Sequence, residues 1–388
     1  MTRPTVWLVG TDDMRLRIPL IAALEARGYR AEVLGTVDDD AFARARVTYR
    51  QYGLERRIDP HGDWAAWRQL CRLLREHRPD VVHAFDKKPA LLVPPAVHAT
   101  GISHAVSTVT GLGYLFSTNA PLALSLRPGF RVLQRLAARK TEIMIFQNTQ
   151  DQTYFRTHGL VLPGRDRLVR SSGIALSDLR VSAETTARLR AELELSGRTV
   201  VVMVSRIVAL KGVREYLEAA AMVRRQRPDI AFLLVGPIAG EGRQAVPMDE
   251  IRRAAASVRY LGPRSDVPAL LSVADMFALP TYYREGVPRV LLEAAAVGLP
   301  LITTDMPGCR DVVRHEWNGL VIPPRSAPAL ADAVLRLADA PEARATMGTR
   351  GREHVRSQFT LDRVADGYAA IYADLLTEAR PALSVPAA

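Results

Sequence analysis

Short apolar runs alternate with helical segments along most of the chain, and this alternation limits the possible folds more than any other feature. In the first part, apolar runs at 5–9 and 31–34 flank a segment at 18–27 with helical periodicity. In the second part, longer runs at 200–204 and 230–235 are rich in Val, Ile and Leu. Strands that alternate with helices indicate parallel sheets covered on both faces.

The length of 388 residues suits two domains rather than one core. A polar helical stretch and Gly197 separate two series of strands and helices, so we expect an N-terminal domain at 1–175 and a C-terminal domain at 198–360. The amphipathic segment at the end predicts that 361–388 forms a C-terminal helix packing back toward the N-terminal domain. The predicted fold class is α/β, with two Rossmann-like, doubly wound domains facing a central cleft.

The formal net charge of +11 is distributed unevenly. Residues 1–175 contain 25 basic and 16 acidic residues, a net of +9, whereas the remainder has 27 and 25, a net of +2. This excess favours an acidic partner for the first half: a membrane surface, a phosphate-bearing substrate or a nucleic acid. Four of the 52 cations are lysines, at Lys87, Lys88, Lys140 and Lys211.

Cysteine usage and hydropathy predict a protein of the reducing cytosol. The two cysteines form no CxxC motif, and the apolar stretch at the start is too short for a signal peptide. Residues 89–126 carry no charged side chain, but four prolines interrupt them, so we expect no membrane span there. The expected protein is soluble or peripheral to a membrane.

Two cations stand on a strand-to-helix loop in the second half. Arg206 and Lys211 follow the strand predicted at 200–204, and Gly212 precedes a helix. Cations at such a loop, next to a helix N-terminus, can neutralise a diphosphate. The alternative is a solvated loop with two surface cations.

A second motif contains two glutamates eight residues apart. Glu285 lies in the loop before a helix that Pro288 is suited to begin, and Glu293 lies on its second turn. Gly286 permits a close backbone approach to a ligand, and a carboxylate can accept hydrogen bonds from the vicinal hydroxyls of a sugar. A helix-surface Glu is the alternative, but this helix is apolar nearly all round, and an unpaired buried Glu would be costly.

These motifs together resemble the retaining GT-B glycosyltransferases of family four, over about residues 5–375. The matching stretches are the Arg206/Lys211-Gly212 pair, 235–237, 260–267, 279–280, 285–294 and 303–309. The resemblance implies that Arg206 and Lys211 hold the donor diphosphate, that Glu285 contacts the donor sugar, and that Glu293 binds the ribose. It places the nucleotide around Tyr260, Leu261 and Arg264, with Gly10, Gly236, Gly286, Val287 and Pro288 as further donor contacts.

The N-terminal half looks like enzymes that extend polyprenyl-diphosphate-linked sugars for O-antigen, capsule or protein N-glycans. The resemblance rests on the stretches 15–20, 84–89 and 108–116. It implies an acceptor site with Arg17, Lys88, Gly111 and Gly113, although ordinary surface cations explain Arg17 and Lys88 equally well. Many relatives carry a His where this chain has Phe85, so His83 is expected to be a strand-end residue.

A row of arginines adds a membrane hypothesis. Arg127, Arg131, Arg135 and Arg139 are spaced four apart, with Lys140 beside them and leucines between. A basic stripe next to apolar residues suits an anionic membrane surface, and an exposed helix packed on its own sheet is the alternative. The expected location is the cytoplasm, peripheral on the inner face of the cell membrane.

The predicted activity is a retaining transfer of a hexose or N-acetylhexosamine from a UDP-sugar to a sugar hydroxyl of a polyprenyl-diphosphate-linked acceptor, without a cofactor or metal. A glycosyltransferase for a soluble secondary metabolite is the first alternative. A nucleic-acid-binding protein is a distant one, suggested by a pI near 10 but without a binding module. The Glu285/Glu293 pair disfavours a UDP-sugar epimerase.

Overall fold

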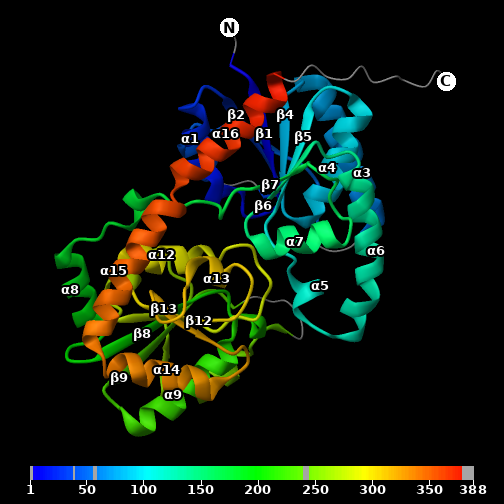
Figure 1. The fold of residues 1–388 in the computed structure, drawn as a ribbon. Helices are drawn as coiled ribbons and strands as arrows, with labels where there is room; N and C mark the ends of the chain where they lie inside the picture. The colour runs from blue at the N-terminus through cyan, green and yellow to red at the C-terminus, as the bar shows by residue number, and fades with distance from the viewer. Residues whose placement is uncertain (1–2, 38–39, 56–58, 239–243, 378–388) are drawn as a thin grey trace. The chain divides into compact units, whose positions relative to one another are not determined.

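The computed structural model describes residues 3–37, 40–55, 59–238 and 244–377 (Figure 1). They form two compact units. The first unit comprises residues 1–173 together with 361–388, and the second comprises 174–360. The last helix, α16 (Leu361–Thr377), therefore belongs to the first unit, where it packs against α1 (Ile18–Glu25).

The first unit contains a parallel sheet of seven strands. The sequential order is 3-2-1-4-5-6-7, so the direction of winding reverses between β1 and β4. The strands in sheet order are β3 (Tyr49–Gln51), β2 (Arg30–Gly35), β1 (Thr5–Val9), β4 (Val81–Phe85), β5 (His104–Val109), β6 (Ile143–Phe146) and β7 (Asp166–Leu168).

Alternate residues of β1 serve different cores. Val6 and Leu8 pack into a cluster with α1 and α16, whereas Trp7 and Val9 pack with α3 (Pro60–His77) and α4 (Lys87–Thr100). Successive side chains of a strand point to opposite faces, so one apolar run fills both layers. This explains why the buried strand reads as a continuous apolar stretch.

The uncharged stretch at 89–126 folds into α4, β5, the short helix α5 (Tyr114–Ser117) and the first turns of α6 (Pro121–Ala138). Helix α4 continues through Pro94 and Pro95, and α6 through Pro128. Within the described residues, no helix has both the length and the apolar character needed to cross a membrane.

The second unit contains a parallel sheet of six strands with the same winding rule. Its order reverses between β8 and β11. The strands in sheet order are β10 (Val258–Tyr260), β9 (Ile230–Val235), β8 (Thr199–Val204), β11 (Met276–Leu279), β12 (Leu301–Thr304) and β13 (Gly319–Ile322). Helix α9 (Val213–Gln226) packs with α14 (Ala327–Ala338), and α12 (Arg289–Val297) packs with α15 (Pro341–Gln358).

The remaining helices are short. They are α2 (Asp40–Arg44), α7 (Thr149–Thr157), α8 (Ala183–Glu192), α10 (Met248–Arg253), α11 (Val267–Ser272) and α13 (Cys309–Val312). Helix α10 ends at Arg253, after which the N–H groups of Ala254 and Ala255 bond carbonyls three residues back and form turns.

Candidate active site

The reversal between β8 and β11 defines the candidate site in the second unit. Because neighbouring strands at such a point send their connections to opposite faces, a crevice opens at their carboxyl ends. The loop after β8 carries Arg206 and ends in a short 3-10 turn, Ala209–Lys211. The loop after β11 carries Glu285. The sequence motifs thus meet where open α/β sheets bind ligands.

Lys211 and Glu285 form an ion pair across this reversal. The Lys211 ammonium donates to Oε1 and Oε2 of Glu285 at 2.6 and 2.7 Å. Their side chains are 12% and 20% exposed, so the pair is accessible but largely shielded from solvent. The ammonium also lies 5.7 Å from the centre of the Tyr283 ring. The carboxylate and ring fix the direction of the lysine. Arg206 is partly exposed on the same loop.

Two glycines bring the loops of this site into backbone contact. Gly212, with φ of +80°, packs on the Pro280 carbonyl, and Gly308, with φ of +78°, packs on the Gly286 carbonyl. A Cβ at either position would overlap the neighbouring carbonyl oxygen. The Tyr282 N–H also donates to the Leu210 carbonyl at 2.9 Å. These contacts fix the backbone conformation of the Glu285 loop, because the backbones of Gly308 and Leu210 lie directly against it.

The residues predicted to contact the nucleotide lie at the β9–β10 side of the same edge. Gly236 packs on the Ser205 carbonyl with φ of +140°, and its own carbonyl accepts a 2.8 Å hydrogen bond from the Tyr260 hydroxyl. The Leu261 N–H donates to Leu234 at 2.9 Å. Arg264 is engaged by both oxygens of Asp266, at 2.8 and 2.6 Å.

Glu293 is held by the first residue of its own helix. Arg289 Nε donates to Glu293 Oε1 at 2.8 Å, one helical turn away. The helix begins at Arg289, one residue after Pro288, while Gly286 and Val287 are buried in the preceding loop. Each glutamate of the motif therefore has a cationic partner, which offsets the cost of placing it on a mostly buried helix.

Cys309 lies beneath the same loop. Burial raises the pKa of its thiol to about 12, despite a hydrogen bond with Thr303. At neutral pH this cysteine is therefore a protonated, inert packing residue. The chemistry available at the site is that of Lys211, Arg206 and the two carboxylates: cations can bind a diphosphate, and carboxylates can accept hydrogen bonds from sugar hydroxyls.

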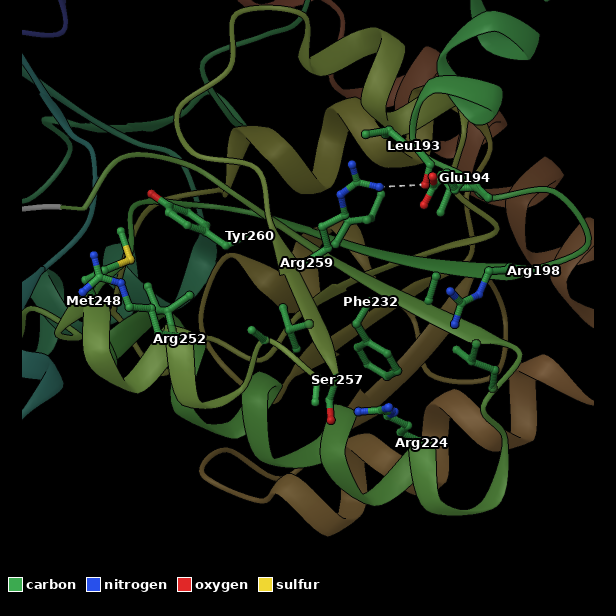
Figure 2. Close-up of a pocket in the computed structure, with 18 residues that line it drawn as sticks. Leu193, Glu194, Arg198, Arg224, Phe232, Met248, Arg252, Ser257, Arg259 and Tyr260 are labelled. Carbon is green, nitrogen blue, oxygen red and sulfur yellow. Dashed lines mark hydrogen bonds between the residues drawn. The ribbon is translucent and has the colours of Figure 1, made fainter.

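A separate pocket of about 550 Å³ follows the edge strand β10 (Figure 2). Arg198, Arg224, Arg252 and Arg259 line it, and Arg259 donates to the Leu193 carbonyl at 2.9 Å. Ile230 also lines it, at the opposite end of β9 from Gly236. Among the described lining residues, Tyr260 is the one assigned to the donor above. The pocket therefore does not coincide with the Lys211–Glu285 pair.

The first unit reverses its winding between β1 and β4, and His83 lies on β4 near that point. His83 is fully buried: Nδ1 is 2.5 Å from the Tyr372 hydroxyl and Nε2 is 2.6 Å from Thr108 Oγ1. Burial, with a contribution from the nearby charge of Arg17, lowers the pKa of His83 well below its ordinary value. A neutral imidazole with both nitrogens occupied is a structural link between β4, β5 and α16.

The predicted acceptor cations have different surroundings. The Arg17 guanidinium lies 3.6 Å from the centre of the Phe85 ring. The Lys88 ammonium instead donates to Asp63 Oδ1 at 2.5 Å and to the Glu55 carbonyl at 2.7 Å. Two N–H groups of Lys88 thus form hydrogen bonds that connect α4 to α3 and to the segment before α3.

The predicted glycines of the first unit lie in turns at the carboxyl edge. Gly111 and Gly113 adopt φ of +123° and +55° on either side of the buried Leu112. Gly10 directly follows β1, where a Cβ would overlap the Met14 side chain. Gly10 belongs to the first unit, whereas the other predicted donor residues belong to the second.

Three further residues lie next to predicted site residues but were not themselves predicted from the sequence. Tyr283 faces Lys211, Arg289 holds Glu293, and Lys87 begins α4 at the reversal of the first sheet. Arg289 was recognisable, since a cation four residues from a carboxylate on a helix predicts a pair. Lys87 was marked by the scarcity of lysine and by its place in the stretch 84–89, but no role was predicted for it.

Within the described residues, no group of three or more His, Cys, Asp or Glu side chains is arranged so that it could hold a metal ion.

Two family models match the chain. The "Glycosyl transferases group 1" model matches residues 186–354, and the "Glycosyl transferase 4-like domain" model matches residues 19–171. The two matches fall on the two units.

Curated relatives with glycosyltransferase names and a solved structure of similar fold accompany these matches. One relative is N,N'-diacetylbacillosaminyl-diphospho-undecaprenol alpha-1,3-N-acetylgalactosaminyltransferase of Campylobacter jejuni. The two sequences are 25% identical over 374 residues, which cover 94% of this chain and 96% of the relative. A second relative is alpha-D-kanosaminyltransferase of Streptomyces kanamyceticus. It is 32% identical to this chain over 209 residues, which cover 51% of this chain and 52% of the relative.

A solved structure of Anabaena Alr3699/HepE with UDP and glucose superposes with a TM-score of 0.78 at 18% identity, covering 96% of this chain and all of that one. At this identity the likeness shows the fold. The chain belongs to the GT-B glycosyltransferases, with a 4-like glycosyl transferase domain in its first unit and a group 1 domain in its second.

Proposed function

We propose that the protein transfers a hexose or N-acetylhexosamine from a UDP-sugar, with retention, to a sugar hydroxyl of a polyprenyl-diphosphate-linked acceptor. The observation that carries the proposal is the Lys211–Glu285 pair at the reversal of the second sheet. The name of the C. jejuni relative, which matches almost the whole chain, supports the acceptor class. The UDP bound by the Anabaena protein supports the nucleotide.

The proposed mechanism relies on charge and orientation. Arg206 and Lys211 stabilise the leaving diphosphate, and Glu285 holds Lys211 and contacts the donor sugar. Glu293 binds the ribose. The departing phosphate oxygen takes the proton of the acceptor hydroxyl on the same face of the sugar, so the anomeric configuration is retained. Preorganised cations at a developing negative charge supply the largest rate effect in such a site. In this proposal, Arg206 and Lys211 also neutralise the diphosphate charge that a metal ion would otherwise neutralise.

A screen of donors and acceptors tests this function. Purified protein is incubated with UDP-glucose, UDP-galactose, their two N-acetylamino counterparts and GDP-mannose. Each donor is combined with N-acetylglucosamine linked to undecaprenyl diphosphate and with soluble glycosides. Mass spectrometry detects the product, and NMR of the anomeric proton gives its configuration. We expect a lipid-linked product with an α-linkage from a UDP-sugar, undiminished by EDTA.

The outcomes separate the parts of the proposal. A β-linked product would overturn retention, loss of activity in EDTA would overturn metal independence, and transfer from GDP-mannose alone would overturn the UDP assignment. Absence of transfer to any acceptor, in protein that binds UDP, would contradict the proposed function as a whole.

A soluble acceptor is the second candidate. The S. kanamyceticus relative, a kanosaminyltransferase, is 32% identical over about half of this chain and supports that reading. Transfer to aminocyclitol or other water-soluble acceptors at rates above those with the lipid-linked acceptor would favour it.

Helix α6 supports a membrane position for the proposed reaction. Its exposed apolar side chains are Leu122, Leu124, Leu126, Val132, Leu133 and Leu136. Three arginines of the predicted stripe point instead to groups of their own unit: Arg127 to the Leu115 and Thr118 carbonyls, Arg131 to the Tyr154 hydroxyl, and Arg135 to the His158 carbonyl. The leucines, rather than these three arginines, thus form the outer face.

We propose that this face inserts into the inner leaflet of the cell membrane, with the exposed Arg139 and Lys140 meeting anionic headgroups. Leu133→Glu with Leu136→Glu should reduce co-sedimentation with phosphatidylglycerol-containing vesicles at least tenfold. Val37→Glu, at a site of similar exposure elsewhere in the unit, is the control. Unchanged binding of the double variant would contradict the membrane assignment. In gel-shift assays we expect no binding to DNA or RNA.

A further inference from the structure

The reversal of the first sheet gathers polar residues that the sequence analysis did not assign. Thr11 follows β1, Asp86 follows β4 and Thr110 follows β5. The Thr110 hydroxyl donates to Asp86 Oδ1 at 2.8 Å, and the Thr11 hydroxyl lies 3.5 Å from Oδ2. Asp86 has φ of +69°, which turns the chain sharply into α4. The loops of three adjacent strands are therefore tied to one carboxylate at the carboxyl edge.

Lys87 follows Asp86 directly and is also influenced by the charge of a second carboxylate, Asp151. It is the first residue of α4, is partly exposed, and feels the charges of Asp86 and Asp151. Asp151 is fully buried in the first turn of α7, where Asn148 Nδ2 donates to it at 3.0 Å. Burial lowers the pKa of Lys87 to about 8 in spite of the two carboxylates, so at pH 7 the side chain is mainly an ammonium.

The charge of this group decides what it can bind. The charges of Asp86, Lys87 and Asp151 sum to a net negative charge, which disfavours a diphosphate. Sugar hydroxyls suit it, because a hydroxyl donates to a carboxylate and accepts from an ammonium. Lys88, the neighbouring lysine, is already engaged by Asp63 and the Glu55 carbonyl.

We propose that Asp86 and Lys87 bind hydroxyl groups of the acceptor's sugar at the reversal of the first sheet, as opposed to the acceptor's diphosphate. This inference rests on the proposed glycosyl transfer for its biological meaning. It assigns a sugar subsite to residues of the first unit, and it gives Lys88 a structural role between α3 and α4.

Binding measurements test the subsite without turnover. Saturation-transfer NMR is recorded with methyl glycosides of glucose, galactose, N-acetylglucosamine and N-acetylgalactosamine, in the presence of UDP to fill the donor site. Farnesyl diphosphate is the probe for phosphate binding. The variants are Lys87→Met, which keeps the length of the side chain, and Asp86→Asn, because Asn tolerates a positive φ. Arg72→Met, on the exposed face of α3, is the control for loss of a cation.

We expect at least one glycoside to bind the wild type, and both variants to weaken its binding about tenfold or more. Farnesyl diphosphate binding should stay within threefold, and Arg72→Met should match the wild type. If Lys87→Met does not fold, Asp86→Asn alone decides.

Unchanged glycoside affinity, no glycoside binding by the wild type, or selective loss of farnesyl diphosphate binding would each overturn the inference. Failure of the transfer screen together with loss of glycoside binding in the variants would contradict the proposed function and leave the sugar subsite standing.

Discussion

The two units wind their sheets by the same rule, yet the polar residues at the two reversals are in opposite situations. In the second unit, Lys211 and Glu285 form a pair that remains partly exposed. In the first unit, His83 is fully buried, and both of its ring nitrogens are occupied by Thr108 and Tyr372. One reversal thus keeps a charged pair partly exposed, and the other buries a neutral ring inside the fold.

The difference shows that position in a fold does not settle a residue's role. Parallel sheets place some polar residue at every strand end, and exposure decides whether it can meet a ligand. At the first reversal, the partly exposed charged residues are Asp86 and Lys87, just after β4. Burial and already formed hydrogen bonds therefore distinguish a structural residue from one that can bind a ligand.

The largest expected effect is on Lys211. If the second reversal is the donor site, Lys211→Ala removes a preorganised cation from the leaving diphosphate, and kcat/KM should fall by about 10²- to 10³-fold. Steady-state transfer assays measure this. The exposed Arg225→Ala on the same unit should retain wild-type rates. Near-normal activity of Lys211→Ala would remove the contrast between the two reversals.

Gly308 tests the rigidity of the second site. Gly308→Ala places a Cβ onto the Gly286 carbonyl at a positive φ, so we expect about 3 kcal/mol of lost unfolding free energy and weaker UDP binding. Urea denaturation and calorimetric titration measure the two effects.

Gly197→Ala is the matched control for Gly308→Ala, since Gly197 also has a positive φ but has open space around its Cβ position. It should cost about 1 kcal/mol, from backbone strain alone. Equal losses in the two alanine variants would show that the Gly286–Gly308 contact does not constrain the loop.

The smallest effect concerns His83 and acid stability. Its folded pKa is depressed, so below the unfolded value of about 6.5 the unfolded chain takes up a proton that the folded chain does not. Stability conferred by the neutral ring is therefore complete above pH 6.5 and declines as the pH falls. Between pH 7.5 and 5, the first unit should lose about 2 kcal/mol that His83→Gln does not lose.

Urea unfolding of both proteins at the two pH values measures the difference. Arg17, whose charge also lowers the pKa of His83, lies in the 3-10 turn Met14–Arg17 before α1. The same pH dependence in the Gln variant would mean that His83 is not buried as a neutral group, and the contrast with Lys211 would fail.

The sequence predicted the fold class and most central elements because buried parallel strands consist of continuous apolar runs. The runs at 5–9 and 230–235 coincide with β1 and β9. The edge strands β3 and β7, three residues each and partly polar, carry no comparable signal. Helix α4 was missed because Pro94 and Pro95 normally end a helix.

The site was predictable only where local sequence fixes it. Arg206, Lys211 and Glu285 lie in loops, and Glu293 lies in the helix that follows the Glu285 loop; the order of these loops along the chain brings them to one edge of the sheet. The choice between Lys87 and Lys88 was not predictable, because it depends on the positive φ of Asp86 and on Asp63, which arrives from another helix. Such contacts exist only after folding.

The return of α16 to the first unit has a consequence for synthesis on the ribosome. The face of β1 and β4 that carries Val6 and His83 is covered by residues of α16, which are translated after the whole second unit. The second unit can therefore fold while the first still exposes part of its apolar interior, which favours chaperone engagement during translation. For the same reason, a chimaera that exchanges acceptor specificity between relatives must transplant 361–377 along with the N-terminal segment.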